Sequence, residues 1–371
     1  MIRTAIIHDW LTGMRGGESV LEAILDLFPQ ADLFTLVYDP KKVSAKIQSF
    51  PIQTSWLQRV PGALQRYRHF LPLMPRAIES FDLTSYDFIL SSSHCVAKGV
   101  RKAKEALHVS YVHAPMRYIW DRFDDYFAPG KASWPVRTAA QLVRQPLQNW
   151  DYAASQSPRV DHLIANSGFI AEQIEQAYGR SSQVIYPFAR LERFLQSQRI
   201  WGDSYLMVTA FAPYKRVDLA IDAFNQLKLP LQIVGSGQDE KRLKSRAGPT
   251  IEFLGSVDDG RVTELYRSCR ALIFPGVEDF GITPLEAMAS GAPVIAYGHG
   301  GVKETVTAET GIFFPSPSIE SLIEAVEKLE KNSRRFDPEA CRKRASLFSE
   351  ARFKEELTSF LTQKLGKNLS L

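Results

Sequence analysis

The chain lacks the residue patterns that build disulfide or metal scaffolds. Its 371 residues include only three cysteines, Cys95, Cys269 and Cys341, which are far apart and show no C-x-x-C spacing. This argues against a disulfide framework or a zinc cage and favours a reducing cytoplasm. There is also no Asp-x-Asp pair and no H-E-x-x-H motif. We therefore expect no metal ion and no other cofactor.

Long apolar runs and strong charge of one sign are also absent. No 18 consecutive apolar residues occur, which predicts that no helix spans a membrane. The apolar stretch at residues 1–9 is too short for a signal peptide and predicts a first strand. The net charge of +4 is too small for a typical nucleic-acid binder, but it favours an anionic ligand or membrane surface.

What is present is a globular composition with alternating strand and helix patterns. Residues are 45% apolar and 23% charged, and the length fits two domains. In the second half, short apolar runs predict strands at 205–209, 231–235, 251–254, 271–274 and 293–296. Helical spacing predicts helices at 217–227, 260–269, 284–290 and 318–331. This alternation is typical of βαβ units around a buried parallel sheet, and hence of an α/β fold.

The first half shows the same alternation less regularly. Strands are predicted at 5–8, 33–37, 88–91, 108–112 and 162–166, and helices at 18–28 and 169–178. Two aromatic, arginine-containing stretches, 54–80 and 118–154, are predicted as helical insertions. We expect two facing Rossmann-like domains, 1–188 and 189–345, with a ligand cleft between them at the carboxyl ends of the strands. Residues 346–371 are expected to form a helix that packs back on the first domain.

The strongest chemical signal is the segment from Glu278 to Glu286, which follows a strand and runs into a helix. Its glycine-containing turn places free backbone N–H groups at a helix N-terminus, where an anion such as a sugar diphosphate is favoured. Glu278 would then hold sugar hydroxyls and Glu286 a ribose. For Glu286 a second interpretation is open, because Thr283-Pro-Leu-Glu286 also fits a capping box.

This segment resembles the paired-glutamate motif of glycosyltransferase family 4, the retaining enzymes of the GT-B fold. Further segments resemble the family over roughly residues 5–330, including 16–18, 111–121, 165–167, 254–257, 288–296 and 300–306. Mannosyltransferases of polysaccharide and O-antigen assembly are the most similar in pattern. The resemblance implies metal-independent transfer of a hexose, mannose from GDP-mannose, to a glycan or lipid-linked acceptor with retention of configuration.

The resemblance also implies site residues. The catalytic set is His113, Lys215 and Glu278, where Lys215 would neutralise the leaving diphosphate and His113 would line the reacting face. The donor set is Gly16, Gly17, Lys215, Arg216, Glu278, Phe280, Gly281, Ile282, Thr283 and Glu286. The acceptor set is Asp9, Trp10, Arg117 and Asp121. One departure stands out: the family usually has an arginine where Ala210 stands here.

Two questions stay open from the sequence. The stretch 56–75 mixes arginines with large apolar residues, and 98–104 adds positive charge. This face would either rest on an anionic membrane, at the inner side of the cell membrane, or pack on its own domain with its arginines in water. The second question is activity: a nucleotide-sugar epimerase or hydrolase, or a catalytically weak nucleotide-sugar-binding subunit, fits the same fold.

Overall fold

The computed structural model describes residues 2–195, 198–332 and 336–366. The chain divides into two compact units: unit 1 comprises residues up to Tyr186 and from Phe353 onward, and unit 2 comprises Pro187–Arg352. The first boundary thus lies two residues before the predicted one. Residues 346–352, which were predicted as part of the returning C-terminal helix, group with unit 2.

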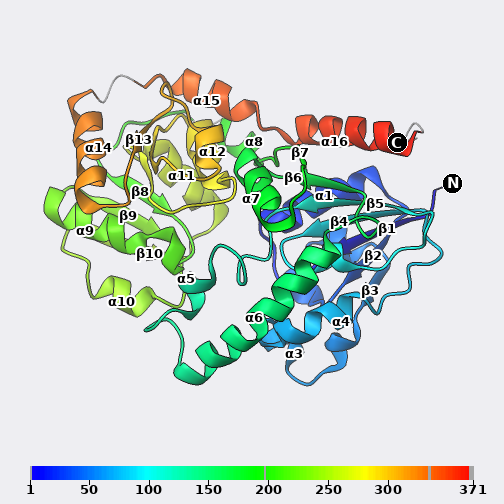
Figure 1. Ribbon diagram of the computed structural model, residues 1–371. Helices are drawn as coiled ribbons and strands as arrows, with labels where there is room; N and C mark the ends of the chain where they lie inside the picture. Colours follow the sequence, from blue (N-terminus) through cyan, green and yellow to red (C-terminus); the bar gives the residue numbers. More distant parts are fainter. Residues whose placement is uncertain (1, 196–197, 333–335, 367–371) are drawn as a thin grey trace. The chain divides into compact units, whose positions relative to one another are not determined.

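Unit 1 is built on a parallel seven-stranded sheet with the order β3-β2-β1-β4-β5-β6-β7 (Figure 1). The strands are β1 (Thr4–His8), β2 (Asp32–Thr35), β3 (Ile52–Thr54), β4 (Phe88–Ser93), β5 (Leu107–Val112), β6 (His162–Ala165) and β7 (Gln183–Val184). The helices are α1 (Gly16–Leu27), α2 (Ala45–Gln48), α3 (Ala63–Arg66), α4 (Met74–Ile78), α5 (Phe123–Phe127), α6 (Trp134–Ala154) and α7 (Gly168–Tyr178). Short 3₁₀ helices are η1 (Pro40–Lys42), η2 (Trp56–Arg59), η3 (Tyr67–Leu73) and η4 (Ala97–Gly99).

Unit 2 repeats this plan with six parallel strands in the order β10-β9-β8-β11-β12-β13. These are β8 (Tyr205–Val208), β9 (Leu231–Val234), β10 (Ile251–Gly255), β11 (Leu272–Phe274), β12 (Val294–Tyr297) and β13 (Gly311–Phe314). Its helices are α8 (Glu192–Leu195), η5 (Pro213–Lys215), α9 (Val217–Leu227), α10 (Glu240–Lys244), α11 (Asp259–Ser268), α12 (Ile282–Ala289), α13 (Val302–Thr305), α14 (Ile319–Lys331) and α15 (Pro338–Ser346).

The strand order of each unit reverses direction once, which defines where a ligand can bind. In unit 1 the reversal lies between β1 and β4, and in unit 2 between β8 and β11. The crossover helices leave these two strands toward opposite sides of the sheet, so a crevice forms outside their carboxyl ends. Both units therefore have the Rossmann-like plan predicted from the sequence, and each offers one such edge.

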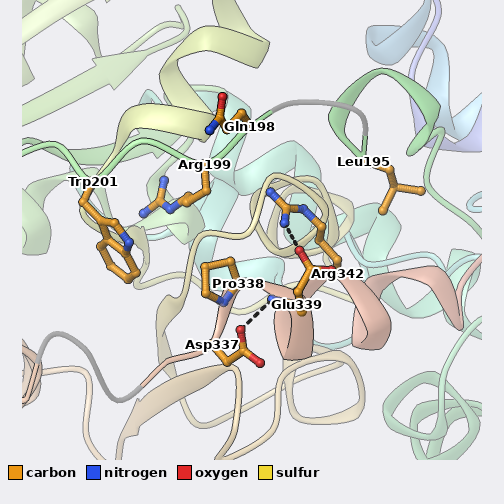
Figure 2. A pocket seen from close by; sticks show the side chains of 8 residues that line it. All are labelled: Leu195, Gln198, Arg199, Trp201, Asp337, Pro338, Glu339 and Arg342. Atoms are coloured by element: carbon orange, nitrogen blue, oxygen red, sulfur yellow. Dashed lines mark hydrogen bonds and ion pairs between the residues drawn. The ribbon is translucent and has the colours of Figure 1, made fainter.

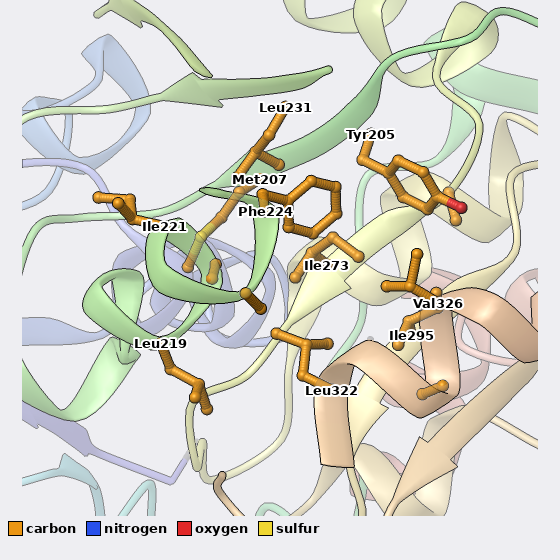
Figure 3. Close-up of a cluster of buried hydrophobic side chains, with 14 of the residues drawn as sticks. Tyr205, Met207, Leu219, Ile221, Phe224, Leu231, Ile273, Ile295, Leu322 and Val326 are labelled. Carbon is orange, nitrogen blue, oxygen red and sulfur yellow. The ribbon is translucent and has the colours of Figure 1, made fainter. Parts of the chain in front are cut away.

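The core of unit 2 shows why the predicted helices form there. The apolar spacing of α9 and α14 turns Leu219, Phe224, Leu322 and Val326 toward the sheet. There they pack on strand residues such as Ile273, as Figure 3 shows. Burying one such side chain stabilises the fold by about 2 kcal/mol, so these contacts fix the sheet edge that carries the site.

The last helix, α16 (Glu350–Leu365), joins the sheet of unit 1 from Phe353 onward. Phe353 packs edge-on against Tyr111 of β5, and Phe360 against His162 of β6. Lys354 also donates to Asp26 of α1 at 2.6 Å. The helix thus packs on the first domain, as predicted. Within the described residues, no helix is both long and apolar enough to cross a bilayer.

Candidate functional site

In unit 2, two predicted site residues meet at the carboxyl ends of β8 and β11. Lys215 ends η5, and Glu278 lies in the loop between β11 and α12; the two side chains form an ion pair. Both are partly exposed, at 15% and 21% of the side chain. A cation and a carboxylate therefore stand together at the edge where the fold predicts a ligand.

Glycines allow the loops around this ion pair to approach each other closely. A Cβ at Gly276 would lie 2.7 Å from the carbonyl oxygen of Tyr214 and 2.8 Å from the Cα of Lys215. A Cβ at Gly301 would collide with the backbone of Asp279. Gly301 also donates its N–H to the carbonyl of Glu278 at 2.9 Å. Larger residues at these two positions would displace the loops that carry Lys215 and Glu278.

The helix that follows, α12, presents further predicted donor residues. Gly281 precedes it with a φ of 94°, a conformation that favours glycine. The first-turn N–H groups, which include those of Ile282 and Thr283, have no acceptor within the helix. The side chain of Phe280 is buried and packs on Phe348, and its predicted place in the donor site stays a prediction.

The structure decides between the two interpretations of Glu286 from the sequence. Thr283 is the second helical residue rather than the N-cap, and no side-chain cap is formed, so the capping box is wrong. Glu286 instead accepts a hydrogen bond at 3.0 Å from the hydroxyl of Tyr266 in α11. Burial raises its pKa to about 7, although the Tyr266 hydrogen bond acts in the opposite direction.

Neighbouring cations in unit 2 are arranged differently from the family pattern. Arg216 adopts a left-handed backbone conformation with a φ of 52°, and its guanidinium pairs with Asp218 at 3.3 Å. Ala210, which stands where the family usually has an arginine, is exposed in the loop after β8. Its surroundings therefore leave room for a longer side chain.

In unit 1, predicted residues gather at the carboxyl ends of β1, β4 and β5. His113 follows β5, and its Nε2 lies 2.9 Å from the hydroxyl of Ser92 in β4. Ser92 is also 3.1 Å from Nδ1 of His8, the last residue of β1. Gly17, in the first turn of α1, lies so close that a Cβ there would be 3.8 Å from the His113 ring. Gly16 begins α1.

The four residues predicted to bind the acceptor differ in how far they are buried. Asp9 is fully buried and accepts hydrogen bonds from four consecutive backbone N–H groups, those of residues 94–97, at 2.6–3.0 Å. Trp10 is buried against Tyr67. These two residues hold the turn after β4 with buried side chains, and their predicted acceptor role stays a prediction. Arg117 is partly exposed, and Asp121 is exposed and accepts from Gln173 at 3.3 Å.

Sequence reasoning missed His8, Ser92 and His94 as members of this cluster. The ring of His94 lies 6.0 Å from that of His8 and 6.3 Å from that of His113. A signal was present, because His8 ends strand β1 and Ser92 and His94 lie at the end of strand β4, and these strands are neighbours in a Rossmann-like sheet. In the described residues, no group of three or more potential ligands could hold a metal ion.

A separate shallow pocket lies elsewhere on unit 2 (Figure 2). Its lining comprises Leu195, Gln198, Arg199, Trp201, Asp337, Pro338, Glu339 and Arg342. Arg199 donates there to the carbonyls of Tyr266 and Arg267, in the last turn of α11, and of Cys269 and Arg270, which follow the helix. The arginine therefore caps a helix C-terminus, and the pocket contains none of the predicted donor residues.

The arginine-rich stretch 56–75 packs on the core of unit 1. Leu57, Tyr67 and Met74 are buried, whereas the arginines at 59, 66, 68 and 76 are exposed. Lys98, which was expected to add surface charge, is fully buried and pairs with Asp151 at 2.6 Å. The stretch thus packs on unit 1 through its buried side chains while its arginines reach the surface, an arrangement that is compatible with either interpretation.

Comparisons with known proteins relate much of unit 2 to one protein family. Residues 203–347 match the family model for glycosyl transferases group 1. The human alpha-1,3/1,6-mannosyltransferase ALG2 is 27% identical over 95% of this chain and 94% of its own length. The O-antigen chain mannosyltransferase C of Escherichia coli is 29% identical over 55% of this chain and 60% of its own length.

Solved structures share the fold at lower identity. HepE of Anabaena, in complex with UDP and glucose, has a TM-score of 0.69 and 17% identity, covering 98% of this chain and 100% of that chain. Sucrose-phosphate synthase of Thermosynechococcus elongatus has a TM-score of 0.69 and 16% identity over 98% and 99% of the two chains. The protein is therefore a two-domain α/β glycosyltransferase with the GT-B fold, and residues 203–347 of its unit 2 match the glycosyl transferases of group 1.

Proposed function

We propose that this glycosyltransferase moves mannose from GDP-mannose, without a metal ion and with retention of configuration, to a glycan or lipid-linked acceptor. The choice of mannose is supported by the names of its relatives, among them the human ALG2 enzyme and the O-antigen enzyme of E. coli. Retention is supported by the resemblance of the chain to the retaining enzymes of glycosyltransferase family 4, and not by any single residue.

The observation that carries the proposal is the ion pair of Lys215 and Glu278 at the ligand-binding edge of unit 2. Without a donor, each charge is balanced by the other. A bound diphosphate offers Lys215 a stronger anionic partner, which stabilises the negative charge that develops on the leaving group. The carboxylate of Glu278 is then free to accept hydrogen bonds from sugar hydroxyls.

Other residues complete the donor site in this proposal. The free N–H groups of Ile282 and Thr283 would face the diphosphate at the start of α12. Glu286 would accept hydrogen bonds from the ribose, and His113 of unit 1 would hydrogen-bond the transferred sugar. Arg117 and Asp121, which reach solvent, are assigned to the acceptor.

Contact with an anionic membrane surface is part of the same proposal, because it would bring a lipid-linked acceptor within reach. The support is the set of exposed arginines at 59, 66, 68 and 76, which share the stretch 56–76 with the exposed Trp56 and Leu73. Arginines beside exposed apolar side chains favour peripheral binding to acidic lipids.

Donor identity is tested by thermal unfolding with GDP-mannose, UDP-glucose, UDP-N-acetylglucosamine and the free nucleotides. A ligand that binds only the folded protein stabilises it by about 2.7 kcal/mol at a hundredfold excess over Kd. We expect GDP-mannose and GDP to raise the melting temperature and the uridine compounds to leave it unchanged. A shift with the uridine series alone would overturn the choice of donor.

Activity is tested by Glu278→Ala in a mannosyl-transfer assay with lipid-linked glycans. We expect turnover to fall at least about 10³-fold, because the loss of a preorganised polar contact in the active site costs on this order. Glu252→Ala is the matched control, since Glu252 is an exposed carboxylate on edge strand β10 of the same unit. Equal activity of the two variants would sink the assignment. Donor conversion without acceptor would instead identify an epimerase or a hydrolase.

A further inference from the structure

A hydrogen bond from the interior of unit 2 reaches Glu286, and the proposed function gives it no part. The hydroxyl of Tyr266 in α11 lies 3.0 Å from Oε2 of Glu286 in α12. The tyrosine is fully buried, whereas Glu286 is partly exposed. The contact therefore joins the core of the unit to the carboxylate that the proposed function assigns to the ribose.

We infer that Tyr266 is a positioning residue, which holds Oε2 of Glu286 so that Oε1 is left to accept the ribose hydroxyls of the donor nucleotide. This inference rests on the proposed function for the role of Glu286 and adds the residue that prepares it. All the protein groups concerned belong to unit 2.

The direction of the hydrogen bond follows from the state of the phenol. Burial raises the pKa of Tyr266 well above its usual range, and the charge of Glu286 and the hydrogen bond to it act in the same direction. The hydroxyl therefore keeps its proton around neutral pH. An ionised carboxylate has no proton and can only accept, so Tyr266 is the donor whenever Glu286 is charged.

The packing around Tyr266 fixes the place from which this proton is donated. The phenol ring meets the ring of Phe194 in α8 edge-on, with the centroids 5.6 Å apart. Arg199 also donates to the backbone carbonyl of Tyr266 at 3.0 Å. Because the phenol is held in place, its hydrogen bond restricts the rotamers open to Glu286 before a ligand arrives.

The other carboxylate oxygen of Glu286 is available to a ligand. Among the described residues, no group forms a hydrogen bond with Oε1, and the side chain reaches solvent. A carboxylate oxygen has two lone pairs, and a ribose offers two hydroxyls, at its 2′ and 3′ positions. A site built to accept these hydroxyls favours a ribonucleotide over a nucleotide that lacks them.

The charged groups around Glu286 leave Tyr266 as the main counterweight to burial. Burial raises the pKa of Glu286 to about 7, and the Tyr266 hydrogen bond is the largest of the effects that lower it. Arg193 of α8 lowers this pKa further and Asp259 of α11 raises it, and these two charges form an ion pair with each other. Loss of the Tyr266 hydroxyl should therefore raise the pKa of Glu286.

Nucleotide binding tests the inference, with Tyr266→Phe as the variant because it removes the hydroxyl and keeps the ring. Titration calorimetry at pH 8 gives the Kd of GDP, of UDP and of the 2′,3′-dideoxy form of each. We expect the ribonucleotide that binds the wild type to bind the variant about 3- to 10-fold more weakly, the size of the cost of ordering one side chain. Its dideoxy form should bind both proteins equally. Equal losses for the two forms, or no loss for the ribonucleotide, would overturn the inference.

Tyr205→Phe is the matched control. Tyr205 is also fully buried, and its hydroxyl donates to Glu330 at 2.5 Å. It lies at the amino end of β8, away from the ligand-binding edge. This variant also loses a hydrogen bond from tyrosine to glutamate, but its Kd for the nucleotide should equal that of the wild type. Thermal unfolding checks that both variants are folded. A weakening of the same size in both would reduce Tyr266 to a structural role.

The state of Glu286 is measured without any nucleotide by ¹³C NMR of its carboxyl carbon, with Glu286→Gln to assign the signal. We expect a titration midpoint at about pH 7 in the wild type and a higher one in Tyr266→Phe. Nucleotide affinity of the wild type should rise through the same pH range, because an ionised carboxylate accepts hydrogen bonds more strongly. An unchanged midpoint in the variant would overturn the inference.

The inference and the proposed function fail in distinguishable ways. Nucleotide binding that depends on Tyr266, without transfer to any acceptor, would keep the positioning role and remove the transferase function. Transfer that depends on Glu278 but not on Tyr266 would keep the function and remove the positioning role. A wild type that binds no nucleotide would overturn both.

Discussion

At the residue scale, Glu286 combines two demands that oppose each other. In the proposed function its carboxylate holds the ribose, yet burial raises its pKa to about 7. The native state therefore keeps a proton that the unfolded chain releases near the ordinary glutamate pKa of 4.5. By linkage, the stability that this proton gives is complete below pH 4.5 and is lost as the pH rises to about 7.

We therefore predict that Glu286→Gln is more stable than the wild type at pH 8, by roughly 1–3 kcal/mol, and not at pH 4.5. The glutamine is neutral at every pH and can still accept the Tyr266 hydrogen bond. Thermal unfolding of both proteins between pH 4.5 and 8 measures the difference. Glu252→Gln, on the exposed edge of the same sheet, should show no such trend, and a parallel trend in both variants would contradict the prediction.

Single residues also show what the sequence could not reveal. The position of Asp9, directly after a strand at the ligand-binding edge, was predicted correctly. The direction of its side chain was not, because that depends on the turn at residues 94–97, whose N–H groups it accepts. A contact between residues some 85 positions apart leaves no local trace in the sequence, so the burial of Asp9 could be learned only from the fold.

At the scale of elements, a buried ion pair ties together parts of unit 1 that the sequence treats as separate insertions. Lys98 of η4 and Asp151 of α6 pair at 2.6 Å, and neither side chain is exposed. The second oxygen of Asp151 accepts from Trp120 and from Tyr178 of α7, each at 2.8 Å. Because Lys98 and Asp151 are both fully buried, loss of Lys98 leaves an unbalanced charge inside the protein.

We predict that Lys98→Met destabilises the protein by about 3–5 kcal/mol, the cost of leaving a buried carboxylate unpaired. Lys46→Met removes an exposed lysine that pairs with Asp26 at 2.8 Å, and it should cost less than about 1 kcal/mol. Urea unfolding of both variants measures the two costs. Equal losses of stability would mean that the buried pair has no special role.

Most elements could be predicted because apolar periodicity reports burial. Helix α9 matches its predicted range of 217–227 without an error, since its apolar residues face the core of unit 2. The missed strands β3, β7 and β13 are two to four residues long, and each lies at a sheet edge. A short edge strand has one neighbour, so its sequence carries only a weak periodic pattern of its own.

The predicted insertion at 54–80 is broken into short helices around Pro61, Gly62 and Pro72, because proline interrupts helical hydrogen bonding.

At the scale of the whole molecule, the fold was more predictable than the site. Two parallel sheets follow from the alternating strand and helix patterns in each half, whereas the strand order that the sheets share over six strands was not predicted. The capping box at Glu286 was wrong because the helix begins one residue before Thr283, and sequence patterns do not define a helix start so finely. The ion pair of Lys215 and Glu278 depends on close approach at Gly276 and Gly301, a property that only backbone geometry reveals.

Net charge alone does not decide whether the molecule binds a membrane, because the position of the charges matters as well. The chain carries a net charge of +4, and four exposed arginines share the stretch 56–76 with exposed Trp56 and Leu73. We predict that the protein co-sediments with anionic lipid vesicles at low salt but not with neutral vesicles. Each arginine near such a surface contributes about 1 kcal/mol, and salt weakens the attraction.

Two variants with the same net charge separate position from total charge. Glutamine at positions 59, 66, 68 and 76 lowers the charge from +4 to zero, and so does glutamine at the four exposed basic positions 241, 242, 244 and 246 of unit 2. We expect the first variant to lose at least about tenfold in vesicle binding, because its arginines share their stretch with apolar side chains that enter the lipid interface. The second should bind like the wild type, since three of its four basic residues, those at 242, 244 and 246, pair with Asp239, Glu240 and Asp222. Equal losses in both variants would show that total charge governs the binding, and the stretch 56–76 would then have no special part in reaching a lipid-linked acceptor.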